Sequence, residues 1–119
     1  PEVEAAGGAP ARAFSGVILF YPYCGPGARA RFAAWSTLAP TLAFVAGADE
    51  IVDGAQCKAL FDRAAAKDKN VSIVYYPSAN HVFDHRELTG ENRRYFDETS
   101  AADAERRYRA FLVAAGPAR

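Results

Sequence analysis

Two apolar segments that each lead to a polar residue constrain the fold of this chain most strongly. Residues 41–46 precede Asp49, and residues 71–76 precede His81. A helix-like pattern lies between them, so this part of the sequence predicts a strand, a helix and a second strand of a parallel sheet. Because the carboxyl ends of parallel strands meet at one edge of a sheet, we expect the Asp49 carboxylate and the His81 imidazole to lie side by side. In one class of catalytic triad the acid and the histidine follow the nucleophile in this order.

A further strand and two helices complete the predicted elements. Residues 16–22 form a continuous apolar run, which is typical of a strand covered on both faces. The central helix is predicted to follow Asp53, which forms a capping-box pattern with Gln56. Its buried face is predicted to consist of residues at helical spacing, namely Cys57, Leu60, Phe61, Ala64 and Ala65.

The final helix is predicted to begin at Ser100, with Asp103 closing a second capping box, and to stop at Gly116. Residues 82–99 before it are predicted to form a polar loop. The inner face of the final helix is predicted to consist of Ala101, Ala104, Tyr108, Phe111, Leu112 and Ala115.

The predicted fold class is α/β, with about three parallel strands and flanking helices that form part of a doubly wound sheet. Residues 1–13 are small residues with proline and glycine and are predicted to be a linker or a flexible N-terminus, whereas residues 14–116 form the α/β unit. Such a partial sheet leaves an apolar edge strand open. We therefore expect a partner to cover this edge, and we do not expect the isolated chain to be a stable monomer.

Composition argues against several classes of function. Fourteen basic and fourteen acidic residues cancel, so nothing indicates nucleic-acid binding. No apolar run approaches the roughly 20 residues that span a bilayer, and no membrane partner is expected. His81, Asp84 and His85 are close in sequence, but their spacing and the scarcity of further ligands argue against a metal site.

The two cysteines are predicted to lie near the same edge of the sheet. Cys24 follows the first strand, and Cys57 lies in the first turn of the central helix. A disulfide between them is one interpretation and would indicate an oxidising, periplasmic or exported location. Two separate buried thiols, compatible with a cytoplasmic location, are the other, and sequence does not decide between them.

Three sequence strings together resemble the C-terminal half of the dienelactone hydrolase family, within the α/β-hydrolase superfamily. They are residues 20–25 (FYPYCG), 40–49 (PTLAFVAGAD) and 76–84 (YPSANHVFD), and the resemblance runs from about residue 14 to 115. It implies that Asp49 is the triad acid and His81 the general base. Glu50 and Asp53 are weaker candidates for the acid.

The nucleophile of this family, a cysteine or serine in a Gly-x-[Cys/Ser]-x-Gly turn, is missing from the sequence. No two of its nine glycines stand four residues apart. Cys24 is a poor substitute because its neighbours include two prolines and no helix signal follows it directly. Tyr23, Trp35 and Phe83 are candidates for lining a substrate pocket, and the alternative for each is an aromatic that packs in the core or anchors a loop.

The resemblance implies a hydrolase of small esters or lactones that works by acyl transfer without a cofactor. We expect this chain alone to be inactive, with the nucleophile supplied by a missing N-terminal half or by a second chain. The alternative is a non-catalytic α/β module, derived from such a hydrolase, that forms a homo-oligomer through its open sheet edge.

Overall fold

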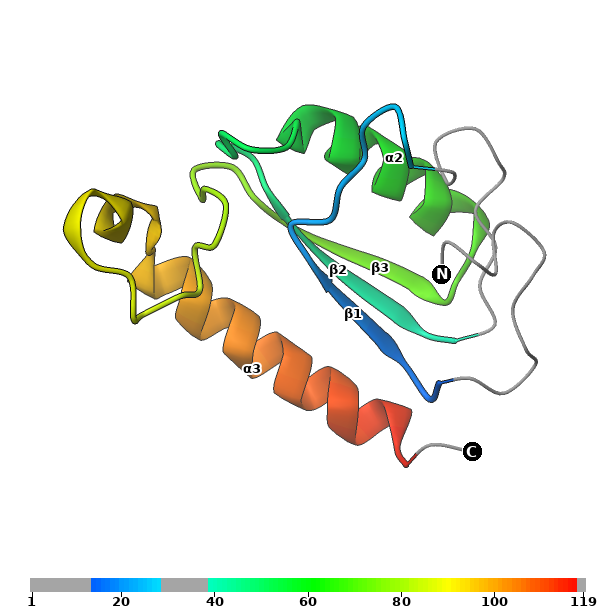
Figure 1. The fold of residues 1–119 in the computed structure, drawn as a ribbon. Helices are drawn as coiled ribbons and strands as arrows, with labels where there is room; N and C mark the ends of the chain where they lie inside the picture. Colours follow the sequence, from blue (N-terminus) through cyan, green and yellow to red (C-terminus); the bar gives the residue numbers. More distant parts are fainter. Residues whose placement is uncertain (1–13, 29–38, 118–119) are drawn as a thin grey trace.

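The computed structural model describes residues 14–28 and 39–117, which form a three-layered α/β arrangement. Its centre is a parallel sheet of β1 (Val17–Phe20), β2 (Thr41–Ala46) and β3 (Val71–Tyr76), in that spatial order. The register places Ala46, the last residue of β2, opposite Tyr76, the last residue of β3. The loops that follow these two strands therefore start at the same edge of the sheet (Figure 1). The predicted fold class is confirmed.

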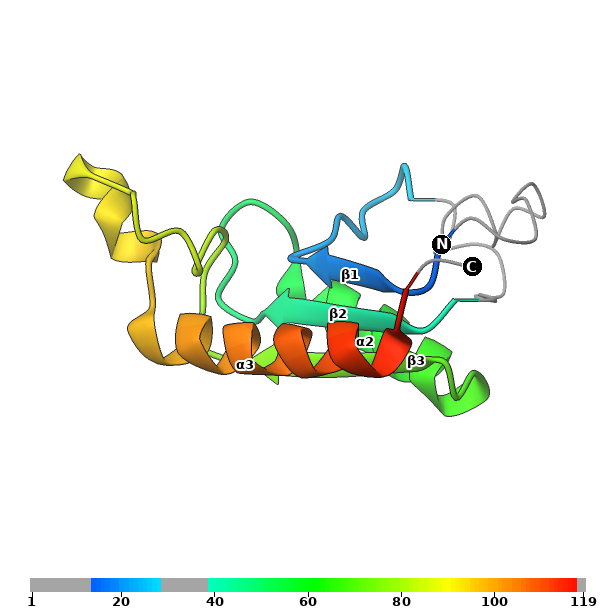
Figure 2. The same cartoon turned by 90° about the horizontal axis from the view of Figure 1, so that it is seen from below.

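Two helices cover opposite faces of this sheet. Helix α2 (Gly54–Lys67) connects β2 to β3, and helix α3 (Glu98–Ala115) follows the long segment after β3. Figures 1 and 2 show the sheet between them. A short 3₁₀ helix, η2 (Gly90–Tyr95), protrudes from the loop before α3, where the sequence predicted only a loop.

The core consists of two clusters separated by β2, all six residues of which are buried. Alternate side chains of a strand point to opposite faces. Ala43 and Val45 accordingly pack with residues of α2, whereas Phe44 packs with Phe83 and with Ala104 of α3. A strand buried on both faces reads as a continuous apolar run, which is why residues 41–46 were recognisable in the sequence.

Helix α2 begins where the sequence predicted. The Asp53 side chain accepts a hydrogen bond from the backbone N–H of Gln56 at 3.0 Å, as an N-cap does. Gly54 then lies so close to the end of β2 that a Cβ atom there would stand 2.2 Å from the carbonyl oxygen of Ala46. The predicted buried face holds, with Cys57, Leu60, Phe61 and Ala64 buried and Ala65 partly buried.

Helix α3 begins earlier than predicted, and one residue of its predicted inner face is wrong. Asp97 is the N-cap, and its side chain accepts hydrogen bonds from the backbone N–H of Thr99 and of Ser100. Ser100, the predicted N-cap, is buried in the first turn. Leu112 is 53% exposed rather than buried, while Gly116 ends the helix as predicted, with a φ of +71°.

Strand β1 lies at one edge of the sheet and, within the described residues, pairs only with β2. All four of its apolar residues are partly exposed. Phe14 just before it, and Leu112 and Val113 near the end of α3, are 65%, 53% and 84% exposed. Neither helix of the described segments is long and apolar enough to cross a membrane.

Candidate active site: an aspartate–histidine pair

The loops after β2 and β3 are joined to each other directly beyond the sheet. The backbone N–H of Gly47 donates to the carbonyl oxygen of Tyr76 at 2.8 Å, and that of Ala48 donates to Ala79 at 2.9 Å. A Cβ atom on Gly47 would lie 2.6 Å from the carbonyl oxygen of Pro77, so only glycine permits this approach. Asp49 directly follows Ala48, and His81 lies two residues after Ala79, so the two side chains are thereby brought together.

Asp49 presents its carboxylate in a fixed orientation. Its Oδ1 accepts hydrogen bonds from the backbone N–H of Ile51 at 2.7 Å and of Val52 at 2.9 Å. Its Oδ2 lies 2.8 Å from Nδ1 of His81. The carboxylate side chain has no solvent exposure, so its charge is balanced by these donors rather than by water.

His81 directs one ring nitrogen at the carboxylate and keeps 24% of its side chain exposed. Because the carboxylate can only accept, Nδ1 carries the proton and Nε2 of a neutral ring is an acceptor. The Tyr21 ring packs on the imidazole, with 4.4 Å between ring centroids. The arrangement can take a proton at Nε2 while Asp49 stabilises the resulting imidazolium.

Tyr21 is a neighbour of the site that the sequence did not reveal, because an aromatic at a strand end reads as core. It follows β1 with a φ of +36°, a rare value for a residue with a side chain. Its hydroxyl donates to Asp84 Oδ1 at 3.2 Å and lies 3.2 Å from Nε2 of His85. Burial first, and then the Asp84 charge, raises the pKa of Tyr21 to about 12, so the hydroxyl stays protonated.

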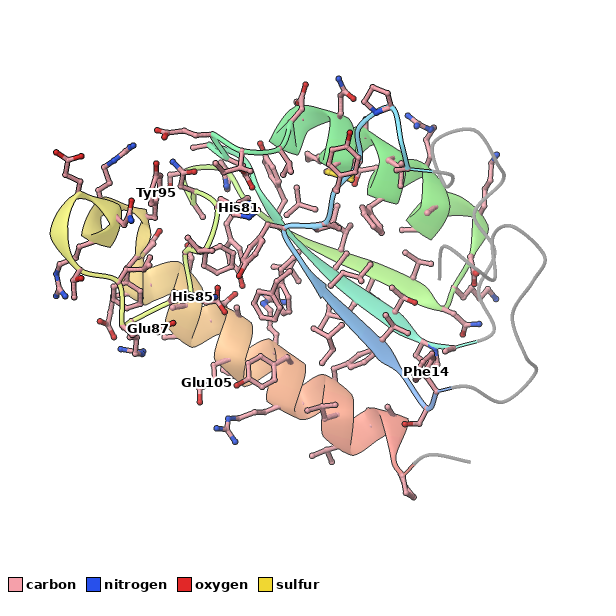
Figure 3. All side chains as sticks on the ribbon, viewed as in Figure 1. Phe14, His81, His85, Glu87, Tyr95 and Glu105 are labelled. Carbon is pink, nitrogen blue, oxygen red and sulfur yellow. A yellow bond between two sulfur atoms is a disulfide. The ribbon has the colours of Figure 1, made fainter. Side chains whose placement is uncertain are left out.

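His85 stands apart from the aspartate–histidine pair. Its Nδ1 lies 2.8 Å from Glu87, and 40% of its side chain is exposed. Figure 3 shows His81, His85 and Glu87 near the carboxyl ends of the strands, with Phe14 at the other end of the sheet. No group of three or more His, Cys, Asp or Glu residues in the described segments has an arrangement that could hold a metal ion.

The weaker candidates for the acid have other partners. Glu50 receives two hydrogen bonds from Arg94, at 3.0 and 3.1 Å, and one from the Tyr95 hydroxyl at 3.0 Å. The hydrogen bond from Arg94, and then that from Tyr95, lowers the pKa of the Glu50 carboxyl. This cluster fastens η2 to the loop that carries Asp49. Asp53 is occupied as the N-cap of α2.

Cys24 and Cys57 form a disulfide with 5.2 Å between their Cα atoms. Cys24 is 4% exposed and Cys57 is 1% exposed, so the bond is buried between α2 and the segment after β1. The described segments contain no free cysteine. The bond removes both thiols as nucleophiles and fastens the chain after β1 to the helix that follows the Asp49 loop.

Two of the three candidate pocket residues lie in the described part of the chain, and their surroundings differ. Tyr23 is 59% exposed, and Phe83 is completely buried in the core against Phe20 and Tyr76. Trp35 lies outside the described residues. A pocket of about 80 Å³ lies elsewhere, between the end of β1, α3 and the loop before it, and is lined by Phe20, Asp84, Arg86, Ala101, Ala104, Glu105 and Tyr108.

Comparison with known proteins identifies the family of the chain and supports its fold. The model of the dienelactone hydrolase family matches residues 5–115. The chain belongs to the dienelactone hydrolase family. A search of curated proteins finds no match. A crystal structure from Klebsiella pneumoniae subsp. pneumoniae MGH 78578, provisionally named a dienelactone hydrolase, is similar, with a TM-score of 0.60 and 21% sequence identity. The similarity covers 80% of this chain and 40% of that one, so this chain corresponds to only part of that structure.

Proposed function

We propose that Asp49 and His81 are the acid and the base of a nucleophile–His–Asp triad that hydrolyses small esters or lactones. The observation that carries the proposal is the 2.8 Å pair between Asp49 Oδ2 and His81 Nδ1, in a chain of the dienelactone hydrolase family. The pair comes from adjacent parallel strands, whose carboxyl ends are where α/β proteins hold reacting groups. The buried carboxylate and the partly exposed imidazole suit a base that must meet a substrate.

The mechanism divides the work between the two residues. A cysteine or serine attacks the carbonyl carbon, and its proton passes to Nε2 of His81. Asp49 holds Nδ1–H and stabilises the imidazolium, which then protonates the leaving alcohol oxygen. Water, giving its proton to His81, then attacks the acyl carbon; the bond to the nucleophile breaks, His81 returns the proton to the nucleophile, and the acid departs. This chemistry requires neither a metal nor a cofactor.

We further propose that the nucleophile and the oxyanion hole come from polypeptide beyond these 119 residues. No Gly-x-[Cys/Ser]-x-Gly turn occurs in the sequence, and both cysteines form the disulfide. The partly exposed β1 edge supports an additional strand on that side of the sheet. The buried disulfide supports a periplasmic or exported location, since such bonds persist in oxidising compartments.

The same edge favours one other candidate function, a binding module that pairs with a second copy of itself. Phe14 just before β1, and Leu112 and Val113 near the end of α3, are exposed apolar residues that a partner would cover. Intact mass and light scattering on the native protein separate the two candidates. A second polypeptide, or a longer one, supports the hydrolase. A homo-oligomer of 12.8 kDa chains without turnover supports the module.

The catalytic proposal is tested with p-nitrophenyl acetate on the native protein. We expect Asp49→Asn to lower kcat by about 10⁴-fold and His81→Ala by about 10⁴–10⁶-fold, as the loss of a triad member does. His85→Ala is the matched control, because it removes the only other imidazole, and it should leave turnover within about twofold. Turnover that survives His81→Ala would contradict the proposed role.

A further inference from the structure

The side-chain oxygen of Asn80 joins the two loops of the candidate site. Its Oδ1 accepts one hydrogen bond from the backbone N–H of Glu50 at 2.9 Å and another from that of His81 at 2.7 Å. Glu50 directly follows Asp49 in the chain. One amide oxygen therefore contacts the backbone beside the acid and the backbone of the histidine itself, although the two loops are 30 residues apart in sequence.

The Asn80 oxygen extends a series of hydrogen bonds between the two loops beyond the point where backbone–backbone hydrogen bonds end. Backbone hydrogen bonds join Gly47 to Tyr76 and Ala48 to Ala79, and among the described residues these are the last such bonds between the two loops. Beyond them the chain turns sharply, as the φ of +55° at Val82 indicates. The Asn80 side chain provides the next link, from the N–H of Glu50.

The link matters because the backbone groups that hold the Asp49 carboxylate belong to its own loop, while His81 belongs to the other loop. The backbone amides of Ile51 and Val52 donate to the Asp49 carboxylate, so the acid is held by its own turn. The backbone N–H of His81 donates to the Asn80 side chain, so the position of the imidazole depends on that hydrogen bond. The 2.8 Å separation of Oδ2 and Nδ1 therefore depends on the relative position of two turns.

We propose that Asn80 is a positioning residue that locks the acid turn to the histidine turn through its single amide oxygen. The inference deepens the proposed hydrolase function and rests on it for any effect on turnover. The geometric claim itself concerns only the described residues. It predicts slow hydrogen exchange at the Glu50 amide, whose residue is exposed but whose N–H is engaged by Asn80.

The test compares variants that remove the acceptor with one that keeps it. Asn80→Ala and Asn80→Leu both remove the acceptor oxygen. If one of these variants does not fold, the other is sufficient for the test. Asn80→Asp retains an acceptor oxygen at the same position of the side chain. The negative charge that it adds lies near Glu50, whose own charge is paired with Arg94. Asn92→Ala, at an exposed asparagine of η2, is the matched control.

The main readout is the NMR signal of the His81 Nδ1–H in protein with ¹⁵N-labelled histidine. The chain has only two histidines, so His81→Ala assigns the signal. We expect a far-downfield signal in the native protein, in Asn80→Asp and in Asn92→Ala, and its loss by exchange with water in Asn80→Ala and Asn80→Leu. Circular dichroism verifies that each variant is folded.

Several results would overturn the inference. They are an unchanged Nδ1–H signal after removal of the acceptor, a signal lost equally in Asn80→Asp, no such signal in the native protein, or rapid exchange of the Glu50 amide. For ester turnover we expect kcat to fall about tenfold or more in Asn80→Ala, with KM within about twofold, and Asn80→Asp to recover most of it. The expected NMR pattern without turnover in the native protein would support the positioning role and contradict the proposed hydrolase.

Discussion

Replacing Tyr76 by phenylalanine removes one hydroxyl group that connects the sheet to α3. The Tyr76 hydroxyl donates to Oδ2 of Asp103 at 2.7 Å. Asp103 also receives hydrogen bonds from Arg107, at 2.7 Å, and from Arg106. The substitution keeps the partly buried ring that packs on Phe83 and deletes only the donor.

The magnitude follows from the partners and the exposure of Asp103. A hydrogen bond to a charged group contributes about 1.5–3 kcal/mol when well buried. The Asp103 side chain is 28% exposed and retains both arginines, so water and these cations compensate for part of the loss. We therefore expect Tyr76→Phe to lower the free energy of unfolding by about 1 kcal/mol at neutral pH.

The pH dependence of this loss has a definite sign. The Tyr76 hydroxyl first, and then Arg107, lowers the pKa of Asp103 from 3.8 to about 2. A carboxyl with a lowered pKa stabilises the fold fully above pH 3.8, and this contribution disappears as the pH falls through about 2. Burial, and then the bond to Asp103, raises the pKa of Tyr76, so the donor stays protonated throughout.

Urea unfolding followed by circular dichroism at several pH values between 7 and 2 measures both effects. The difference between native and Tyr76→Phe protein should be about 1 kcal/mol at pH 7 and should shrink between pH 4 and 2. Tyr75→Phe is the matched control, since this ring belongs to the other core cluster, beside Lys58. Equal stabilities at pH 7, or a difference that does not change with pH, would refute the reasoning.

Three further substitutions test the packing of the sheet. Gly54→Ala should destabilise by more than about 2 kcal/mol in urea unfolding, because its Cβ would stand 2.2 Å from the carbonyl oxygen of Ala46; a loss below about 0.5 kcal/mol, the size typical of a surface change, would contradict this close approach. Cys57→Ser, or reduction of the native protein, should lower stability by about 3–4 kcal/mol, since the disulfide closes a loop of 33 residues; unfolding midpoints that are insensitive to reductant would speak against the bond. Phe83→Ala should lower the free energy of unfolding by about 3–5 kcal/mol, because the ring is completely buried, and should leave the slope of that free energy against urea concentration unchanged. A smaller loss would contradict the prediction that the substitution leaves a cavity.

β2, β3 and α2 were predictable because burial leaves a pattern in their sequences, an apolar run in the strands and a helical period in α2. β1 is shorter than its predicted run of residues 16–22. β2 and β3 have the predicted bounds, and Asp53 caps α2 as predicted. The start of α3 was not predictable in the same way, because the capping-box pattern begins at Ser100, whereas the fold uses Asp97, three residues earlier, as the N-cap. The choice is made by a contact distant in sequence, the hydrogen bond from the Asp97 N–H to the carbonyl oxygen of Phe83. Local capping chemistry contains no information about that bond.

Some residues of the candidate site could be predicted from the sequence, and others could not. The proximity of Asp49 and His81 could be predicted, since it follows from the order and direction of two parallel strands. Tyr21 and Asn80 could not, because their roles depend on a positive φ and on an amide rotamer, and neither leaves a period in the sequence. Each of the three strands nevertheless delivers one of these groups: β1 leads to Tyr21, β2 to Asp49 and β3 to the Asn80–His81 turn. The register that aligns the ends of the strands therefore also sets the spacing of the site, and a substitution that shifts β1 should disturb His81 through the Tyr21 ring.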